Sequence, residues 1–157
     1  MKKLVLTLIT VFVIAIGSFA QSNKEEIDLI QASIGMEKKA AFAEFIKLEG
    51  AQKDAFWALY DEYEVKRKEL GKKRLTLLEN YVKGYETMNE ETTEQVLKDM
   101  ISMTSETDKL IASYANKMKK GAGVKAAAQF FQLEGYMTSV VRATILENIP
   151  FIGGLDK

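Results

Sequence analysis

Residues 51–85 have the sequence AQKDAFWALYDEYEVKRKELGKKRLTLLENYVKGY, and this stretch decides the fold. Apolar residues recur along it every seven positions, at Phe56, Tyr63, Leu70 and Leu77. A second row has the same spacing and holds Tyr60, Arg67, Arg74 and Tyr81. The two rows alternate four and three residues apart, which is typical of the seam of a coiled-coil-like helix. We therefore predict one helix about 52 Å long, at about 1.5 Å per residue.

Helical periodicity also runs through the rest of the chain, which has a single proline, Pro150. We expect a first helix over residues 23–33, opened by a Ser22–Glu25 capping box and ended by Gly35. Further helices are predicted over residues 37–47, from a turn at 88–92 to Lys120, and over 124–148. The fold class is all-α, an elongated long-helix hairpin with flanking helices. Because the long helix does not fit a compact globule, we expect a homodimer.

The first twenty residues have the layout of a cleaved secretory signal peptide. Lys2 and Lys3 precede an apolar run from Leu4 to Ile16, and small residues follow at Ser18 and Ala20. The apolar run is short for a permanent membrane span, although an uncleaved anchor is the alternative. The chain has no cysteine, so we expect no lipid anchor. We predict cleavage after Ala20, export to the periplasm, and one domain over residues 21–157.

The composition of the chain excludes several classes of enzyme and of metal site. The chain has neither cysteine nor histidine, which excludes Ser-His-Asp and Cys-His catalysis and thiolate or imidazole zinc sites. Without Lys2 and Lys3 the exported part has 20 basic and 22 acidic side chains, a net charge of −2. Such a charge gives no field that would attract nucleic acid. We expect no enzyme activity, no cofactor and no metal site.

Two short stretches carry degraded copies of a capping motif, Leu48-Glu49-Gly50-Ala51-Gln52 and Glu91-Thr92-Thr93-Glu94-Gln95. With the export signal and the helical pattern, they resemble the LTxxQ family of periplasmic proteins, in which Thr caps a helix and Gln stands at its third position. Asn89 is an alternative cap for the helix that runs from the turn at 88–92 to Lys120. The segment Gln129-Phe130-Phe131-Gln132-Leu133-Glu134, with Ile149-Pro150 after it, is similar to the C-terminal part of Spy-like sensor proteins of Bacteroidetes-type bacteria.

The resemblance implies an ATP-independent chaperone of the Spy/CpxP type, which binds unfolded clients on an extended helical surface. Aromatic, basic and thioether side chains suit such adaptable binding. The candidate client-binding or partner-binding residues are Trp57, Tyr60, Tyr63, Arg67, Arg74, Met100 and Met103. The alternative is that the aromatic and Met stripes are core and that the arginines extend to solvent at the hairpin edge. An envelope-stress sensor that docks a specific periplasmic partner is the second functional hypothesis.

Overall fold

The computed structural model describes the backbone of residues 24–154 and the side chains of residues 35–154. Within these residues the chain forms α-helices and one short 3-10 helix and no β-strand, which confirms the all-α class. The elements are α2 (Lys24–Phe45), α3 (Gly50–Gly84), η1 (Tyr85–Thr87), α4 (Glu90–Gly121) and α5 (Val124–Asn148). The predicted signal peptide and Ser22 of the predicted capping box lie outside the described residues.

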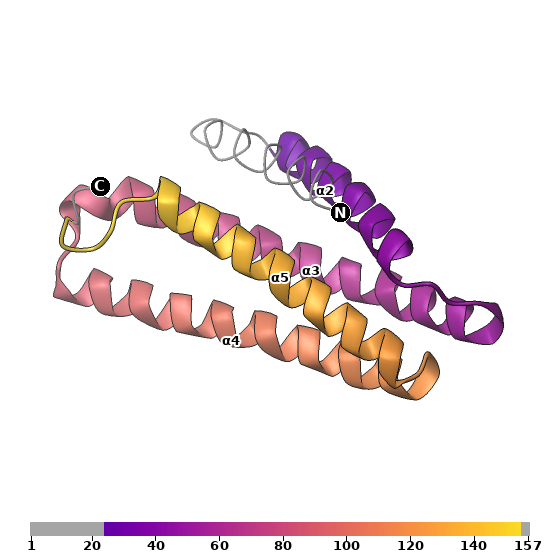
Figure 1. Ribbon diagram of the computed structural model, residues 1–157. Coiled ribbons are helices and arrows are strands. Elements are labelled where there is room, and N and C mark those ends of the chain that lie inside the picture. Colours follow the sequence, from indigo (N-terminus) through magenta and orange to yellow (C-terminus); the bar gives the residue numbers. More distant parts are fainter. Residues whose placement is uncertain (1–23, 155–157) are drawn as a thin grey trace.

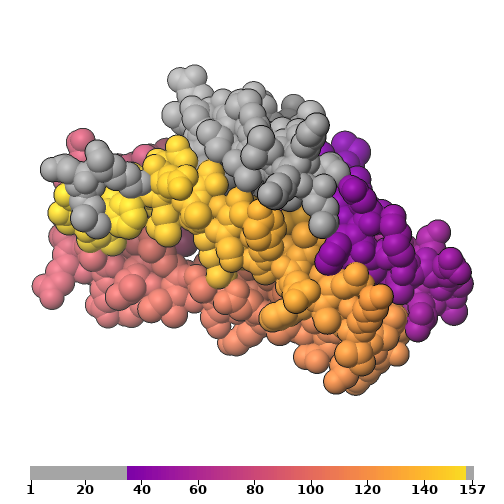
Figure 2. Space-filling model, in the orientation of Figure 1, coloured from indigo at the N-terminus to yellow at the C-terminus, as the bar shows by residue number. Residues whose placement is uncertain are grey.

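The long helix is α3, and its 35 residues match the predicted range within one position at each end. It forms an antiparallel hairpin with the 32-residue α4, and α5 turns back along α4 (Figure 1). Pro150 follows directly after the last turn of α5, where its missing N–H ends the helix. The molecule is elongated, as predicted, with α5 running along much of the face shown in Figure 2.

Helix α2 differs from the prediction, because it is one continuous helix and not two. Gly35 does not end it, since a glycine inside a helix costs about 1 kcal/mol but breaks no hydrogen bond. A Cβ atom at Gly35 would lie 3.6 Å from both Glu64 Oε2 and Lys68 Cε, so this part of the helix packs against side chains of α3. The helix ends at Phe45, and Gly50 begins α3 with a φ of +53°, a conformation that favours glycine.

The N-terminus of α4 is capped by Asn89, which was the alternative cap in the sequence. The Thr92 backbone N–H donates to Asn89 Oδ1 at 2.9 Å, and the Asn89 N–H donates to Thr92 Oγ1 at 2.8 Å. Thr92 is therefore the third helical residue and not the cap that the LTxxQ pattern would make it. At α3, Glu49 is the N-cap residue, but its side chain makes no capping hydrogen bond within the described residues.

Replacing Asn89 by alanine is expected to lower the free energy of unfolding by about 1 kcal/mol, because the Thr92 backbone N–H loses its acceptor, Asn89 Oδ1. Urea unfolding followed by circular dichroism measures this change. Asn80→Ala is the matched control, since Asn80 is exposed inside α3 and caps no helix terminus. Equal effects of the two substitutions would show that the side-chain bond at Asn89 contributes nothing.

Two hydrophobic clusters lie at opposite ends of the bundle, separated by a polar section. The first cluster joins all four helices, and its largest buried members include Phe42, Phe56, Tyr60, Tyr63, Tyr114, Met118 and Phe130. The second cluster is small, with Tyr81, Ile145 and Ile149 as its buried members. The Tyr81 hydroxyl donates to the Pro150 carbonyl at 2.6 Å, which fixes the chain after α5. Polar bonds from α4 to α3 and α5 occupy the section between the clusters, Arg74 to Thr107 and Arg142 to Asp108.

Candidate functional site

Tyr60 and Tyr63 are core residues, with exposed fractions of 0% and 1%. The Tyr63 ring packs edge-on against Phe130 of α5 at 5.1 Å between centroids, and the Tyr60 ring lies 5.0 Å from Phe42 of α2. Trp57 is half-buried at the edge of the same cluster. The helical spacing that suggested a client surface at these tyrosines therefore places them inside the fold. In this conformation neither tyrosine is accessible to a client.

The two tyrosine hydroxyls lie beside buried carboxylates. Burial raises the pKa of both phenols, and the negative charges of Glu64 and Glu134 raise each further. Both side chains are therefore neutral over the whole physiological range. They act as apolar rings with a polar end, and not as acids or bases.

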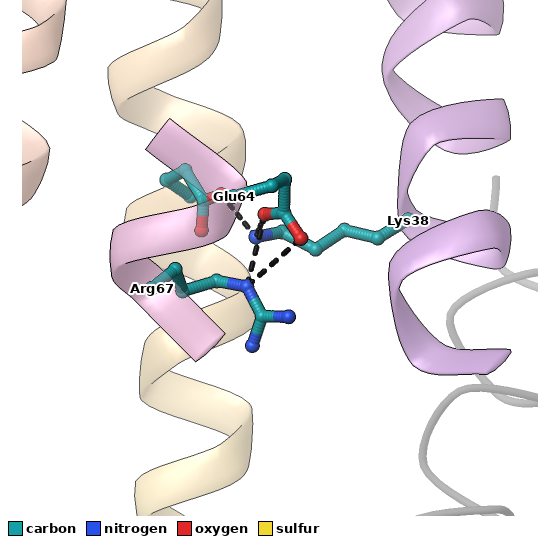
Figure 3. A network of polar contacts seen from close by, with 4 residues as sticks. Lys38, Glu64 and Arg67 are labelled. Carbon is teal, nitrogen blue, oxygen red and sulfur yellow. Dashed lines mark hydrogen bonds and ion pairs between the residues drawn. The ribbon is translucent and has the colours of Figure 1, made fainter. Parts of the chain in front are cut away.

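A buried ion cluster lies against these aromatic rings and joins three helices (Figure 3). We define it as Lys38 of α2, Glu64 and Arg67 of α3, and Glu134 of α5. Lys38 Nζ lies 2.7 Å from Glu64 Oε1 and also pairs with Glu134. Arg67 Nε donates to both carboxylate oxygens of Glu64, at 2.9 and 3.0 Å. Two cations and two carboxylates thus compensate one another in the interior.

The charges of the cluster control its protonation. Burial alone would raise the pKa of Glu64, but Lys38 and Arg67 outweigh burial, so that this pKa lies below its ordinary value. For Arg67, burial acts to lower the pKa, and the nearby Glu64 and Glu134 carboxylates raise it overall. The Arg67–Glu64 pair is therefore ionised at neutral pH. The ion pairs of Lys38 with Glu64 and Glu134 connect α2 to α3 and α5, although Arg67 Nη2 is buried without a hydrogen-bond partner among the described residues.

The other predicted residues lie in different parts of the bundle. Arg74 is half-buried in the polar section, where its Nη2 donates to Thr107 Oγ1 at 2.9 Å. Burial, together with the positive charges of Arg142 and Arg67, lowers the pKa of Arg74. Met100 packs against the second cluster, and Met103 is half-buried on the same helix. The seven predicted residues thus do not form one surface.

An apolar depression on the surface between α2 and α3 was missed by the sequence reasoning. It is open to solvent, has a volume of about 450 Å³, and is lined by Met36, Lys39, Ala40, Ala43 and Trp57. Lys39 Nζ lies 5.4 Å from the centre of the Trp57 ring and 2.5 Å from Asp61 Oδ1, at the rim. Trp57 was the one predicted residue that lies here. The spacing of Met36, Ala40 and Ala43, four and three apart, was the available signal.

The chain matches no known family model, no curated protein and no solved structure. The resemblance to the LTxxQ family therefore stays a prediction from the sequence. Within residues 24–154, no helix is both long enough and apolar enough to cross a membrane. In the same part of the chain, no group of three or more acidic side chains is placed to hold a metal ion.

Proposed function

We propose that this protein is an exported, ATP-independent chaperone-like protein that binds apolar segments of unfolded clients. The observation that carries the proposal is the apolar depression between α2 and α3. The lining is mostly apolar and open to solvent, so the depression can hold an apolar side chain of a client. The layout of residues 1–20 supports a periplasmic location, and the lack of histidine and cysteine argues against an enzyme.

The composition of the depression suits clients without a fixed shape. Met36 is flexible and largely exposed, so its thioether side chain adapts to different apolar groups. Trp57 offers a rigid aromatic wall, and the alanines leave room for a client side chain. Lys39 at the rim pairs with Asp61 and lies over the Trp57 ring, so the rim of the depression is polar and electrically balanced. The site therefore selects for apolar character and not for one sequence.

The function is tested by aggregation of an unrelated unfolding protein in the absence of ATP, with Ala40→Glu as the variant. The substitution places a carboxylate in the apolar depression, while the fold keeps its stability because Ala40 is exposed. Losing about 50 Å² of apolar burial costs about 1.3 kcal/mol at about 25 cal/mol/Å², so client affinity falls about tenfold. The measurement is the protein concentration that gives half-maximal protection.

Leu97→Glu is the matched control, because Leu97 is 55% exposed on α4, outside the depression. It is expected to leave protection unchanged. If the unmodified protein gives no protection at near-stoichiometric ratio, the chaperone proposal fails. The envelope-stress sensor that docks one defined partner is then the function to pursue.

A further inference from the structure

The surface of α3 and α5 that lies beneath α2 is built around a cation and an aromatic ring supplied by α2. Lys38 enters between Glu64 of α3 and Glu134 of α5 and pairs with both carboxylates. Its Nζ atom also lies 5.1 Å from the centre of the Tyr63 ring, close enough for a cation–π contact. Two carboxylates and an aromatic face thus surround one ammonium group. This arrangement is suited to binding a lysine side chain.

The aromatic part of the contact lies one helical turn further along α2. Phe42 is fully buried, with its ring 5.0 Å from Tyr60 of α3 and 5.8 Å from Phe130 of α5. Residues four apart on a helix share one face, so Lys38 and Phe42 reach this surface together. The surface therefore recognises a helical segment in which an aromatic residue follows a lysine by four positions.

The net charge of the α3–α5 surface requires that its ligand supply a cation such as the Lys38 ammonium group. Without Lys38, the remaining members of the buried ion cluster are two carboxylates and one guanidinium, Glu64, Glu134 and Arg67. The surface would then carry an uncompensated negative charge at residues that are buried while α2 is in place. Such a charge favours any segment that supplies a cation and rejects neutral or acidic segments.

Among the residues whose side chains are described, α2 contacts α3 and α5 through its C-terminal half, residues 35–45. The α2 ribbon diverges from α3 toward its N-terminal end (Figure 1). Over residues 35–45, the buried side chains are Lys38, Ala41 and Phe42, all within two turns. The connection to α3, residues 46–49, is not helical. Phe45, Ile46 and Leu48 also pack against the first cluster, next to this connection. A helix joined to the rest of the fold at one end by a non-helical connection is of the kind that opens without global unfolding.

We propose that α2 is an intramolecular ligand of the α3–α5 surface, and that opening of α2 lets this surface bind an amphipathic helical segment with a Lys-x-x-x-aromatic pattern from another protein. Opening of α2 dismantles the apolar depression, because four of its five lining residues belong to α2. The proposal concerns the α3–α5 surface beneath α2, and its tests measure hydrogen exchange and peptide binding and not chaperone activity. It also gives the buried Tyr60 and Tyr63 and the half-buried Arg67 a role in binding after α2 opens.

Amide hydrogen exchange of the unmodified protein tests the opening step. Backbone amides of residues 38–45 in α2 are expected to exchange about tenfold faster than those of residues 56–64 in α3, because α2 opens on its own. Equal exchange rates in the two segments would mean that α2 leaves only on global unfolding, and would overturn the proposal.

Peptide binding tests the specificity of the surface. The probe is a fluorescein-labelled peptide of residues 35–47, titrated against the full chain and against its Phe42→Ala variant. The variant weakens the internal competitor, so the peptide is expected to bind it about tenfold more tightly than the unmodified chain. Equal binding to both chains contradicts the proposal. If the variant does not fold, the exchange measurement above decides.

Two control peptides distinguish specific binding at the lysine site from nonspecific hydrophobic binding. The Lys38→Gln peptide keeps Phe42 but loses the buried cation, and is expected to bind about tenfold more weakly. The Lys39→Gln peptide has the same net charge as the Lys38→Gln peptide, but it alters the lysine that pairs with exposed Asp61. Its affinity is expected to stay within about twofold of that of the unmodified peptide. Equal affinities of the two control peptides would overturn the proposed recognition.

Discussion

Replacing Phe130 by alanine is expected to lower the free energy of unfolding by about 3–5 kcal/mol, because the substitution empties a space at the centre of the first cluster. The Phe130 side chain is fully buried, and its ring contacts those of Phe42 and Tyr63. These two rings come from α2 and α3, so the lost contacts weaken the packing of three helices at once. Chemical unfolding followed by circular dichroism measures the change.

The neighbouring residue gives a control within the same helix. Phe131 is 52% exposed, so Phe131→Ala removes a ring that is largely in water already. We expect a change within about 0.5 kcal/mol for this variant, as for most surface substitutions. A similar loss of stability in both variants would mean that α5 packs in a different orientation from the one described.

The second large effect is expected at Lys38. Changing Lys38 to methionine keeps the length of the side chain but leaves the Glu64 and Glu134 carboxylates with Arg67 as their remaining cation in the cluster. Removing one partner of a buried ion pair costs about 3–5 kcal/mol, because a charge stays buried without compensation. Lys39→Met is the control, since Lys39 and its partner Asp61 are 47% and 60% exposed. The control is expected to cost under about 1 kcal/mol.

The effect of Lys38→Met should depend on pH in a defined direction. The pKa of Glu64 in the folded protein lies below its ordinary value of 4.5, so Glu64 adds stability above pH 4.5 in the unmodified protein. This contribution is lost as the pH falls through the folded pKa. In the variant, protonation of Glu64 removes a buried charge that lacks its lysine. The difference in stability between the two proteins is therefore expected to shrink on acidification, and a constant difference would contradict this account.

The long helices could be predicted from the sequence because their signals are local. The seven-residue spacing through Phe56 and Tyr63 located α3, and Pro150 located the end of α5. Gly35 misled the prediction, because a glycine ends a helix or lies inside it depending on what packs beside it. That neighbour is α3, which no local pattern identifies.

The buried ion cluster could not be predicted from the sequence. Lys38, Glu64 and Glu134 are far apart in the chain, and nothing near any one of them indicates that the other two are partners. The periodicity of Tyr60 and Tyr63 correctly indicated one face of a helix, but the same pattern describes a core and an exposed seam. The deciding fact is that α2 covers this face, which requires the tertiary arrangement.

The polar section between the two hydrophobic clusters separates two regions of apolar packing. The Arg74–Thr107 and Arg142–Asp108 hydrogen bonds connect helices there. We therefore expect the ends of the bundle to unfold as two cooperative units of unequal size. Trp57, the chain's single tryptophan, packs against the larger unit, so its fluorescence follows the melting of one end, while helical circular dichroism sums both.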